Sequence, residues 1–371
     1  MKWVFWISVG TVLYTYLGYP LVLCLRSRWS ARPVRSAANL PPISIIMAVY
    51  NEAHTLPDKL HNLSQLDYPE DHLEIVIVSD GSTDGTNELL RQCAHVKLRA
   101  IVLPEHKGKA IALNHGIEAA RGEVLVFTDA RQRIEANALR CLAADLADPE
   151  VGCVSGELIF ARAKQGLGEC AGLYWRMEKQ IRRWESLSGS VVGASGALYA
   201  ARRSLVVPLP EGTLLDDVYI PMHVARQGAR VVFEAKARVW DNLPASLAQE
   251  FRRKTRTLTG NYQMLQSASW VLSPSNPVLF RFVSHKLLRL AVPFALAGIF
   301  CSSLLLHSSF YKVAMLAQLL FYGFGLLGLM HPWLGVASRP ANAVLTFLTL
   351  NAAALVAFLN FVIGKKSVWS R

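Results

Sequence analysis

Polar and acidic residues follow the apolar segments in the middle of the chain. One apolar segment ends at Asp80 and the glycine-rich turn GSTDG, and another ends at Asp129, while Tyr50, Asn51 and Glu52 follow a third. A basic, glycine-containing segment, EHKGKAIALN, follows shortly after the first turn. Carboxylates beside such a loop suit a divalent cation with a diphosphate, because hard cations take oxygen ligands and bridge phosphates. A single aspartate after a strand would be expected only to close a turn.

The elements that must position these residues form an alternating pattern. Strands are predicted at 43–49, 74–78, 98–103 and 123–127, with helices at 56–66, up to 93, and 109–120. Strands that are apolar on both faces and alternate with helices predict a parallel sheet with right-handed crossovers. Ligands of such sheets bind beyond the carboxyl ends of the strands, so the polar residues are expected on one rim. The dinucleotide motif GxGxxG and the phosphate-binding motif GxxxxGK[ST] are both absent, which disfavours dehydrogenases and P-loop ATPases.

The two ends of the chain carry its apolar excess. Of the 371 residues 52% are hydrophobic and only 18% are charged. Four runs are long enough to cross a bilayer, at 3–25, 287–306, 311–330 and 341–364. The first run is too long for the core of a signal peptide and lacks a cleavage pattern, which favours an uncleaved anchor. The sequence therefore predicts an integral membrane protein.

Positive charge gives the orientation of the predicted spans. Arg26, Arg28, Arg32 and Arg35 follow the first run, against Lys2 before it. The positive-inside rule then places the middle of the chain on the cytoplasmic side of an inner or plasma membrane. Three more crossings place the basic tail at 365–371 outside, which conflicts with the same rule, and the sequence leaves this conflict open.

The net charge of +12 and the six scattered cysteines indicate which ligands and cross-links the chain is expected to have. No nucleic-acid-binding motif is present, so an anionic lipid surface or a phosphorylated substrate explains the charge better. The cysteines show no paired spacing for a disulfide framework or a zinc site. The predicted organisation is an anchor and linker (1–40), a cytoplasmic α/β domain (41–245), interfacial amphipathic helices (246–284) and a C-terminal membrane region (285–371).

Seven motifs in this order resemble a known family. AVYNE, SDGSTDGT, KGKAIALNHG and FTDA resemble the inverting family 2 glycosyltransferases with a GT-A fold. GASGALYAARR, LLDDVYIP and FRRKTRTLTGN resemble the membrane-embedded branch with the cellulose, hyaluronan and poly-N-acetylglucosamine synthases. The resemblance covers about 42–261 and implies a nucleotide-sugar-binding domain with a mostly parallel sheet, flanked by transmembrane helices. It also implies transfer from a UDP-sugar to a glycan or lipid-linked acceptor, in polysaccharide or glycolipid biosynthesis.

The resemblance assigns nucleotide-binding roles residue by residue. Ala48, Tyr50 and Glu52 lie where the family holds the nucleotide, and Asp80 matches the acid that recognises the uracil. Lys109 matches a basic residue near the diphosphate, although a solvated lysine at the start of a helix fits its position as well.

Two matches depart from the family pattern. Asp129 matches the first acid of the DxD metal motif and implies Mg²⁺ or Mn²⁺, but Arg131 stands where a second aspartate often lies. Arg253 and Arg256 align with the QRxRW motif, with Thr257 in place of its tryptophan. Losing that tryptophan removes a stacking surface for an acceptor sugar, which predicts short products. The same basic stretch also suits a helix in the lipid headgroup layer.

The acceptor side is implied by two further motifs. Asp217 matches the catalytic base, with Asp216 as its neighbour in the acidic pair. An aspartate pair could instead cap a helix. Ser195 and Gly196 lie where the family lines the acceptor pocket, where small residues let a sugar approach.

Two other functions stay open at this point. The chain could be a processive polysaccharide synthase, with partner membrane proteins completing a channel that four spans enclose poorly. It could also be a catalytically weak membrane regulator that binds nucleotide sugars, because Arg131 interrupts the metal motif.

Overall fold

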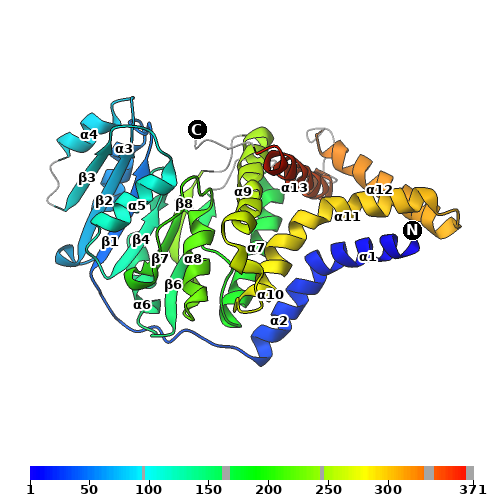
Figure 1. Cartoon of the computed structure of the whole chain (residues 1–371), viewed down its shortest axis with the longest axis horizontal. Helices are drawn as coiled ribbons and strands as arrows, with labels where there is room; N and C mark the ends of the chain where they lie inside the picture. Colours follow the sequence, from blue (N-terminus) through cyan, green and yellow to red (C-terminus); the bar gives the residue numbers. More distant parts are fainter. Residues whose placement is uncertain (94–96, 161–167, 243–245, 330–337, 365–371) are drawn as a thin grey trace.

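An α/β domain and a group of long apolar helices form the two ends of the molecule (Figure 1). The computed structural model describes residues 1–93, 97–160, 168–242, 246–329 and 338–364. Residues 30–42, which contain no helix or strand, connect the first membrane helix to the first strand.

A single mixed sheet of eight strands organises the α/β domain, in the order β3-β2-β1-β4-β7-β6-β8-β5. The strands are β1 (Ile43–Val49), β2 (Leu73–Asp80), β3 (Leu98–Leu103), β4 (Val124–Thr128), β5 (Arg133–Ile134), β6 (Val151–Phe160), β7 (Leu198–Arg202) and β8 (Arg230–Asp241). The first four pair in parallel, β7 runs antiparallel to β4 and β6, and β6 pairs in parallel with β8. The predicted parallel strands and mostly parallel α/β fold are confirmed.

The core lies on both faces of this sheet because successive side chains of a strand point to opposite faces. In β1, Ile46 and Ala48 belong to one buried cluster, whereas Ile45 and Met47 belong to the other. The helices that cover the faces are α3 (Leu56–Ser64), α4 (Thr86–Gln92), α5 (Lys109–Ala119), α6 (Ala138–Asp145) and α8 (Asp216–Arg226). The short 3-10 turns are η2 (Glu70–His72), η3 (Arg203–Leu205) and η4 (Ser269–Leu272). Burial on both faces explains why β1, β2 and β4 are almost uninterrupted apolar runs.

Within the described residues, four helices are long and apolar enough to cross a membrane, at Lys2–Trp29, Leu279–Leu305, Ser309–Leu327 and Pro340–Val362. They comprise α1 (Lys2–Leu13), η1 (Tyr14–Gly18), α2 (Tyr19–Trp29), α10 (Leu279–Arg281), η5 (Phe282–Leu287), α11 (Leu288–Leu305), α12 (Ser309–Leu327) and α13 (Ser338–Val362). Large apolar side chains on them are exposed, for example Ile7, Leu17 and Leu320. The chain is therefore an integral membrane protein, as predicted from the four runs. The predicted end of the third run at 330 and the tail at 365–371 lie outside the described residues.

The second membrane helix begins at Leu279, upstream of the predicted start at 287. Its first turns contain charged and polar residues, so the apolar run in the sequence begins only after them. Arg281 and His285 are nevertheless buried, because both hydrogen-bond to groups at the end of α7 (Gly168–Leu187). The region predicted as interfacial helices thus contains α9 (Leu247–Ser267), which packs along α13, and the start of this span.

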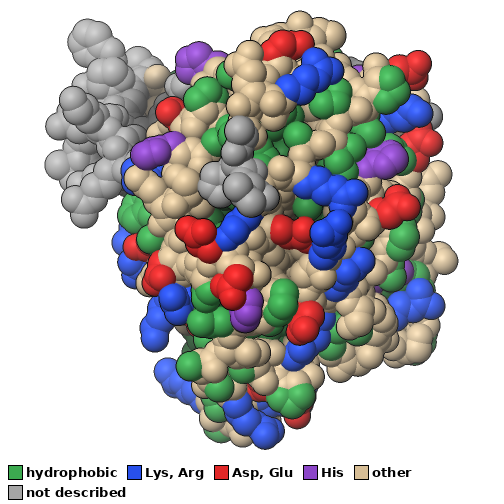
Figure 2. Space-filling view, turned by 90° about the vertical axis from the view of Figure 1, so that its left-hand side faces the viewer, with side chains coloured by type: hydrophobic (Ala, Val, Ile, Leu, Met, Phe, Trp, Pro, Cys, Tyr) green, Lys and Arg blue, Asp and Glu red, His purple; other side chains and the backbone are tan. Residues whose placement is uncertain are grey.

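The end of the molecule away from the membrane helices has a mixed charged surface. Figure 2 shows basic and acidic side chains interspersed over this face, with apolar side chains only in small patches between them. This distribution is typical of a solvated surface.

Candidate active site

A cavity of about 790 Å³ lies between the α/β domain, α7, α9 and the membrane helices. Every predicted site residue except Asp80 lines it. These lining residues are Ala48, Tyr50, Glu52, Lys109, Asp129, Ser195, Gly196, Asp216, Asp217, Arg253 and Arg256. Residues from motifs that are up to 200 positions apart therefore converge, because the ends of β1 and β4 and the start of α8 meet at one rim.

The loops after β1 and β2, which the resemblance assigns to the nucleotide, form one connected unit. The backbone N–H of Asn51 donates to Ser82 Oγ over 3.0 Å, and Asn51 Oδ1 accepts from the Thr83 N–H at 2.8 Å. The Glu52 N–H donates to Thr86 Oγ1 at 2.9 Å. These bonds join the AVYNE and DGSTDG motifs, so Tyr50 and Glu52 are held in place by the second loop.

Asp80 organises a third loop from below the cavity. Its two carboxylate oxygens accept from the backbone N–H groups of Lys107 and Gly108, both at 2.8 Å, and Oδ2 lies 2.8 Å from His106 Nδ1. A Cβ on Gly81 would lie 2.4 Å from the His106 nitrogen, so only glycine allows this approach. Asp80 itself is fully buried. Its direct contact with a base stays a prediction, whereas its contacts here fix the loop before Lys109.

Lys109 lies between the two acidic motifs and is not a solvated lysine. Its Nζ donates to Asp129 Oδ1 at 2.9 Å and contacts Asp216 Oδ1 at 3.0 Å, and its side chain is 14% exposed. Burial alone would lower the pKa of Lys109, but the two carboxylates outweigh burial and raise it. Burial opposes ionisation of Asp129, yet Lys109, followed by Arg256 and Lys59, holds the pKa of Asp129 below its usual value. Lys109 and Asp129 are therefore both charged at neutral pH.

Arg131, which stands where the metal motif often has a second aspartate, pairs with an acid from β8. Its guanidinium makes a two-pronged pair with Asp241, with Nε to Oδ1 at 3.2 Å and Nη2 to Oδ2 at 3.1 Å. Both side chains line the cavity. Within the described ranges no group of three His, Cys, Asp or Glu residues could hold a metal ion. The single carboxylate of Asp129 therefore fits a metal that shares its ligands with a diphosphate, not one held by protein alone.

Asp217 lies in the first turn of α8 and lines the cavity. Its Oδ2 accepts the Gly196 N–H at 3.0 Å, and a Cβ on Gly196 would lie 3.0 Å from that oxygen. Burial, together with the negative charge of Asp216, raises the pKa of Asp217 to about 6. An elevated pKa near the working pH suits a carboxylate that accepts a proton. Ser195 is held beside it by its N–H, which donates to Ser155 Oγ at 2.9 Å.

The basic helix α9 supplies two arginines from its first half. Arg253 pairs with Glu250 at 2.7 Å, and its guanidinium lies 5.6 Å from the centre of the Trp175 ring. Arg256 lines the cavity and acts on Asp129 through its charge. Thr257 also lines the cavity. The basic stretch of α9 therefore faces the cavity through Arg253, Arg256 and Thr257. A contact of this stretch with lipid headgroups stays a prediction.

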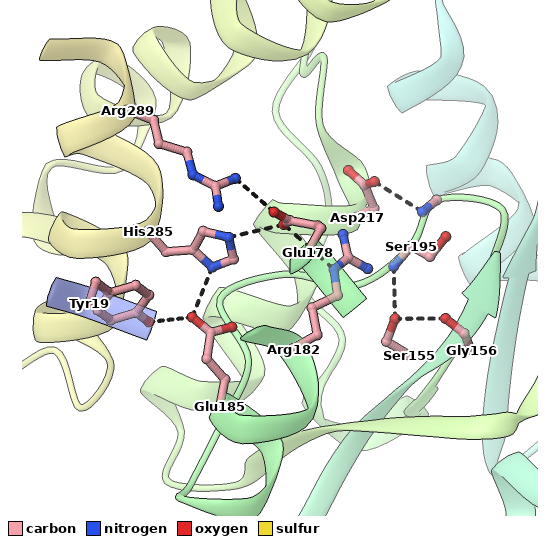
Figure 3. A network of polar contacts seen from close by, with 11 residues as sticks. Tyr19, Ser155, Gly156, Glu178, Arg182, Glu185, Ser195, Asp217, His285 and Arg289 are labelled. Carbon is pink, nitrogen blue, oxygen red and sulfur yellow. Dashed lines mark hydrogen bonds and ion pairs between the residues drawn. The ribbon is translucent and has the colours of Figure 1, made fainter. Parts of the chain in front are cut away.

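Sequence reasoning missed a polar network on the membrane side of the cavity (Figure 3). His285 lies between two buried glutamates, with Nδ1 2.8 Å from Glu185 and Nε2 3.0 Å from Glu178. Arg289 Nη1 donates to Glu178 at 2.8 Å, and Tyr19 donates to Glu185 at 2.5 Å. The sequence feature that could have indicated this network is the set of ionisable residues next to an apolar segment. Placing ionisable groups at membrane depth costs free energy, so such residues usually mark functional sites.

Comparison with known proteins identifies the class. The sequence model described as "Glycosyl transferase family 2" matches residues 44–207. A mannosyltransferase from Pyrobaculum calidifontis, solved with GDP-Man and Mn²⁺, superposes with a TM-score of 0.73 at 25% identity, over 98% of this chain and 99% of that chain. Together with the α/β fold and the cavity, these matches establish a GT-A-like glycosyltransferase domain.

Two curated relatives narrow the class to a branch. The poly-β-1,6-N-acetyl-D-glucosamine synthase of Staphylococcus aureus is 27% identical over 268 residues, 71% of this chain and 63% of the relative. The corresponding synthase of Staphylococcus epidermidis is 26% identical over 234 residues, 62% of this chain and 56% of the relative. The chain spans less than two thirds of the length of either relative. Residues 44–207 therefore match the family 2 glycosyltransferase model, and the chain resembles the branch of these synthases.

Proposed function

We propose that the chain transfers a sugar, with inversion, from a UDP-sugar to a hydroxyl of a glycan or lipid-linked acceptor during polysaccharide or glycolipid synthesis. The observation that carries this proposal is the row Asp129–Lys109–Asp216 beside Asp217 in one cavity. It places groups for a diphosphate next to a carboxylate that has the pKa of a base. The printed names of the relatives and the GDP-Man and Mn²⁺ of the solved mannosyltransferase support the same chemistry.

In this proposal the residues divide into donor and acceptor groups. Tyr50, Glu52 and Lys109 hold the nucleotide and its diphosphate, and Arg256 stabilises the diphosphate as it departs. Asp217 takes the proton of the acceptor hydroxyl, while the Gly196 N–H orients its carboxylate. Asp129 would hold Mg²⁺ or Mn²⁺ together with the diphosphate oxygens, and the ion would neutralise charge on the leaving group.

The same proposal places the catalytic domain on the cytoplasmic face of an inner or plasma membrane. Arg26 and Arg28 lie in the last turn of α2, on the side of the α/β domain, which supports this orientation.

The test is transfer by the purified full-length chain in lipid nanodiscs. UDP-N-acetylglucosamine, UDP-glucose and GDP-mannose are supplied in turn, with Mn²⁺, with Mg²⁺ or with excess EDTA. We expect release of the nucleoside diphosphate from a UDP-sugar only when a divalent ion is present. Binding of the donor without any turnover, with every acceptor extract tried, would favour the regulator over the enzyme.

A further inference from the structure

The catalytic cavity extends beyond the sugar-binding residues toward the membrane helices. Its wall includes Tyr16, from the middle of the first membrane helix, and Leu350, Asn351 and Ala354, from the middle of α13. An acceptor with a lipid tail could therefore reach Asp217 without leaving the level of the spans. The opposite wall at this end is charged, which a purely apolar ligand would not require.

Three cations surround the passage between Asp217 and the membrane helices. Arg182 comes from α7, whereas Lys286 and Arg289 come from the start of the second span, and all three line the cavity. The positive charges of Lys286 and Arg182 act on Asp217, where they oppose the rise of its pKa. Figure 3 shows the Arg182 guanidinium between Glu178 and the Asp217 carboxylate. These cations thus lie within electrostatic range of the proposed base.

The carboxylates beside this passage contact two of the three cations. Arg289 pairs with Glu178 at 2.8 Å, and Arg182 lies 3.9 Å from the same carboxylate. Lys179, another cation of the wall, is neutralised by Glu157 at 2.7 Å. Glu185, the second glutamate of the network, contacts His285 and Tyr19.

Lys286 differs from Arg182 and Arg289, because no carboxylate of the described residues lies within ion-pair distance of it. It is partly buried and faces the cavity, yet it has no hydrogen-bond or ion-pair partner in the part of the chain that the structure describes. Charged groups away from bulk water are normally paired, because an unpaired one loses its hydration without compensation. An anion from a ligand would supply the missing partner, and the neighbouring guanidinium groups would strengthen its binding.

We infer that the membrane-side end of the cavity binds the phosphate of a lipid-borne acceptor, through Lys286 with Arg182 and Arg289. The inference rests on the proposed transferase function and specifies its acceptor. The phosphate lies at the cations, the tail extends along Tyr16 and Ala354, and the acceptor hydroxyl faces Asp217. Phosphate fits this site better than a neutral glycan because only an anion would give Lys286 an ion-pair partner.

The test uses dodecyl phosphate as a probe, with the full chain in phosphatidylcholine nanodiscs. Lys286→Gln should weaken its binding about 10- to 100-fold, which corresponds to the loss of one charged hydrogen bond. Lys286→Arg should restore most of the affinity. The matched control is Lys312→Gln, which removes a lysine that is exposed in the first turns of α12 and absent from the cavity wall. It should change the affinity by less than about twofold.

Two results would overturn the inference. One is equal affinity of dodecyl phosphate for the original chain and for Lys286→Gln, or equal binding of dodecanol. The other is displacement of dodecyl phosphate by an equal concentration of inorganic phosphate, which would show that the lipid tail contributes nothing. UDP-sugar binding is measured on the same samples. Failure of donor binding would refute the proposed function, whereas normal donor binding with an indifferent Lys286 variant would refute only the lipid phosphate.

Discussion

Asp217→Asn separates a catalytic base from a residue that only starts a helix. The substitution keeps the size of the side chain and its contact with the Gly196 N–H, but the amide cannot take a proton from the acceptor. General-base catalysis contributes about 10²- to 10⁴-fold, so transfer should fall by that factor. Donor affinity should be nearly unchanged, because Asp217 lies on the acceptor side of Lys109.

The pKa of Asp217 gives the same prediction a pH dependence. A carboxylate with a pKa of about 6 is ionised above that pH and becomes protonated below it. Its ionised fraction is about 91% at pH 7 and about 9% at pH 5, so the transfer rate should fall roughly tenfold between them. This loss should appear in initial rates measured at saturating donor and metal.

Asp216→Asn tests the cause of that pKa. The negative charge of Asp216 raises the pKa of Asp217, so removing it should move the acid limb of the profile to lower pH. The rate at pH 7 should fall less than in Asp217→Asn, since Lys109 keeps Asp129 as a partner. The control is Asp71→Asn, whose side chain is 82% exposed, and its profile should match that of the original chain. Equal, mild losses in both α8 variants, or a flat profile from pH 5 to 8, would show that the pair only begins the helix.

Four further predictions concern separate parts of the account. Asp129→Ala should abolish transfer and weaken donor binding in Mn²⁺ or Mg²⁺, as measured by calorimetry; full activity in EDTA would exclude a required metal. Arg131→Met should lower the melting temperature, because it leaves buried Asp241 without its guanidinium, and adding Asp241→Asn should recover it. Because Thr257 offers no stacking surface, mass spectrometry should find short products, and high polymer from the purified chain alone would contradict this. A membrane-impermeant maleimide should label Asp71→Cys only in opened cells, and labelling from outside would refute the cytoplasmic domain.

The first half of the sheet could be predicted from sequence because its strands are short apolar runs between turns. Ile43–Val49 and Leu98–Leu103 match the predicted ranges, since apolar runs between turns leave little ambiguity. The second half was not predicted. Val151–Phe160 carries an acid and two glycines, and Arg133–Ile134 is too short to show a period. Strands of this kind are defined by their pairing partners, which a local pattern does not contain.

The convergence of the motifs at one rim could also be predicted, but their partners could not. Parallel topology brings Asp129 near the AVYNE loop, whatever the details of packing. The pair Arg131–Asp241 and the contact of Glu178 with His285 join residues that are more than 100 positions apart. No spacing rule connects such positions. His285 is polar and lies outside the apolar run predicted as the second span. The membrane side of the cavity therefore became visible only in the folded chain.

The anomeric configuration of the product tests the central claim most directly. The purified chain is given an α-linked UDP-sugar and a membrane extract, and the new linkage is examined by proton NMR. A single displacement assisted by Asp217 predicts a β linkage, with transfer by Asp217→Asn at least about 100-fold slower under the same conditions. An α linkage, or transfer by Asp217→Asn at close to the original rate, would contradict the account.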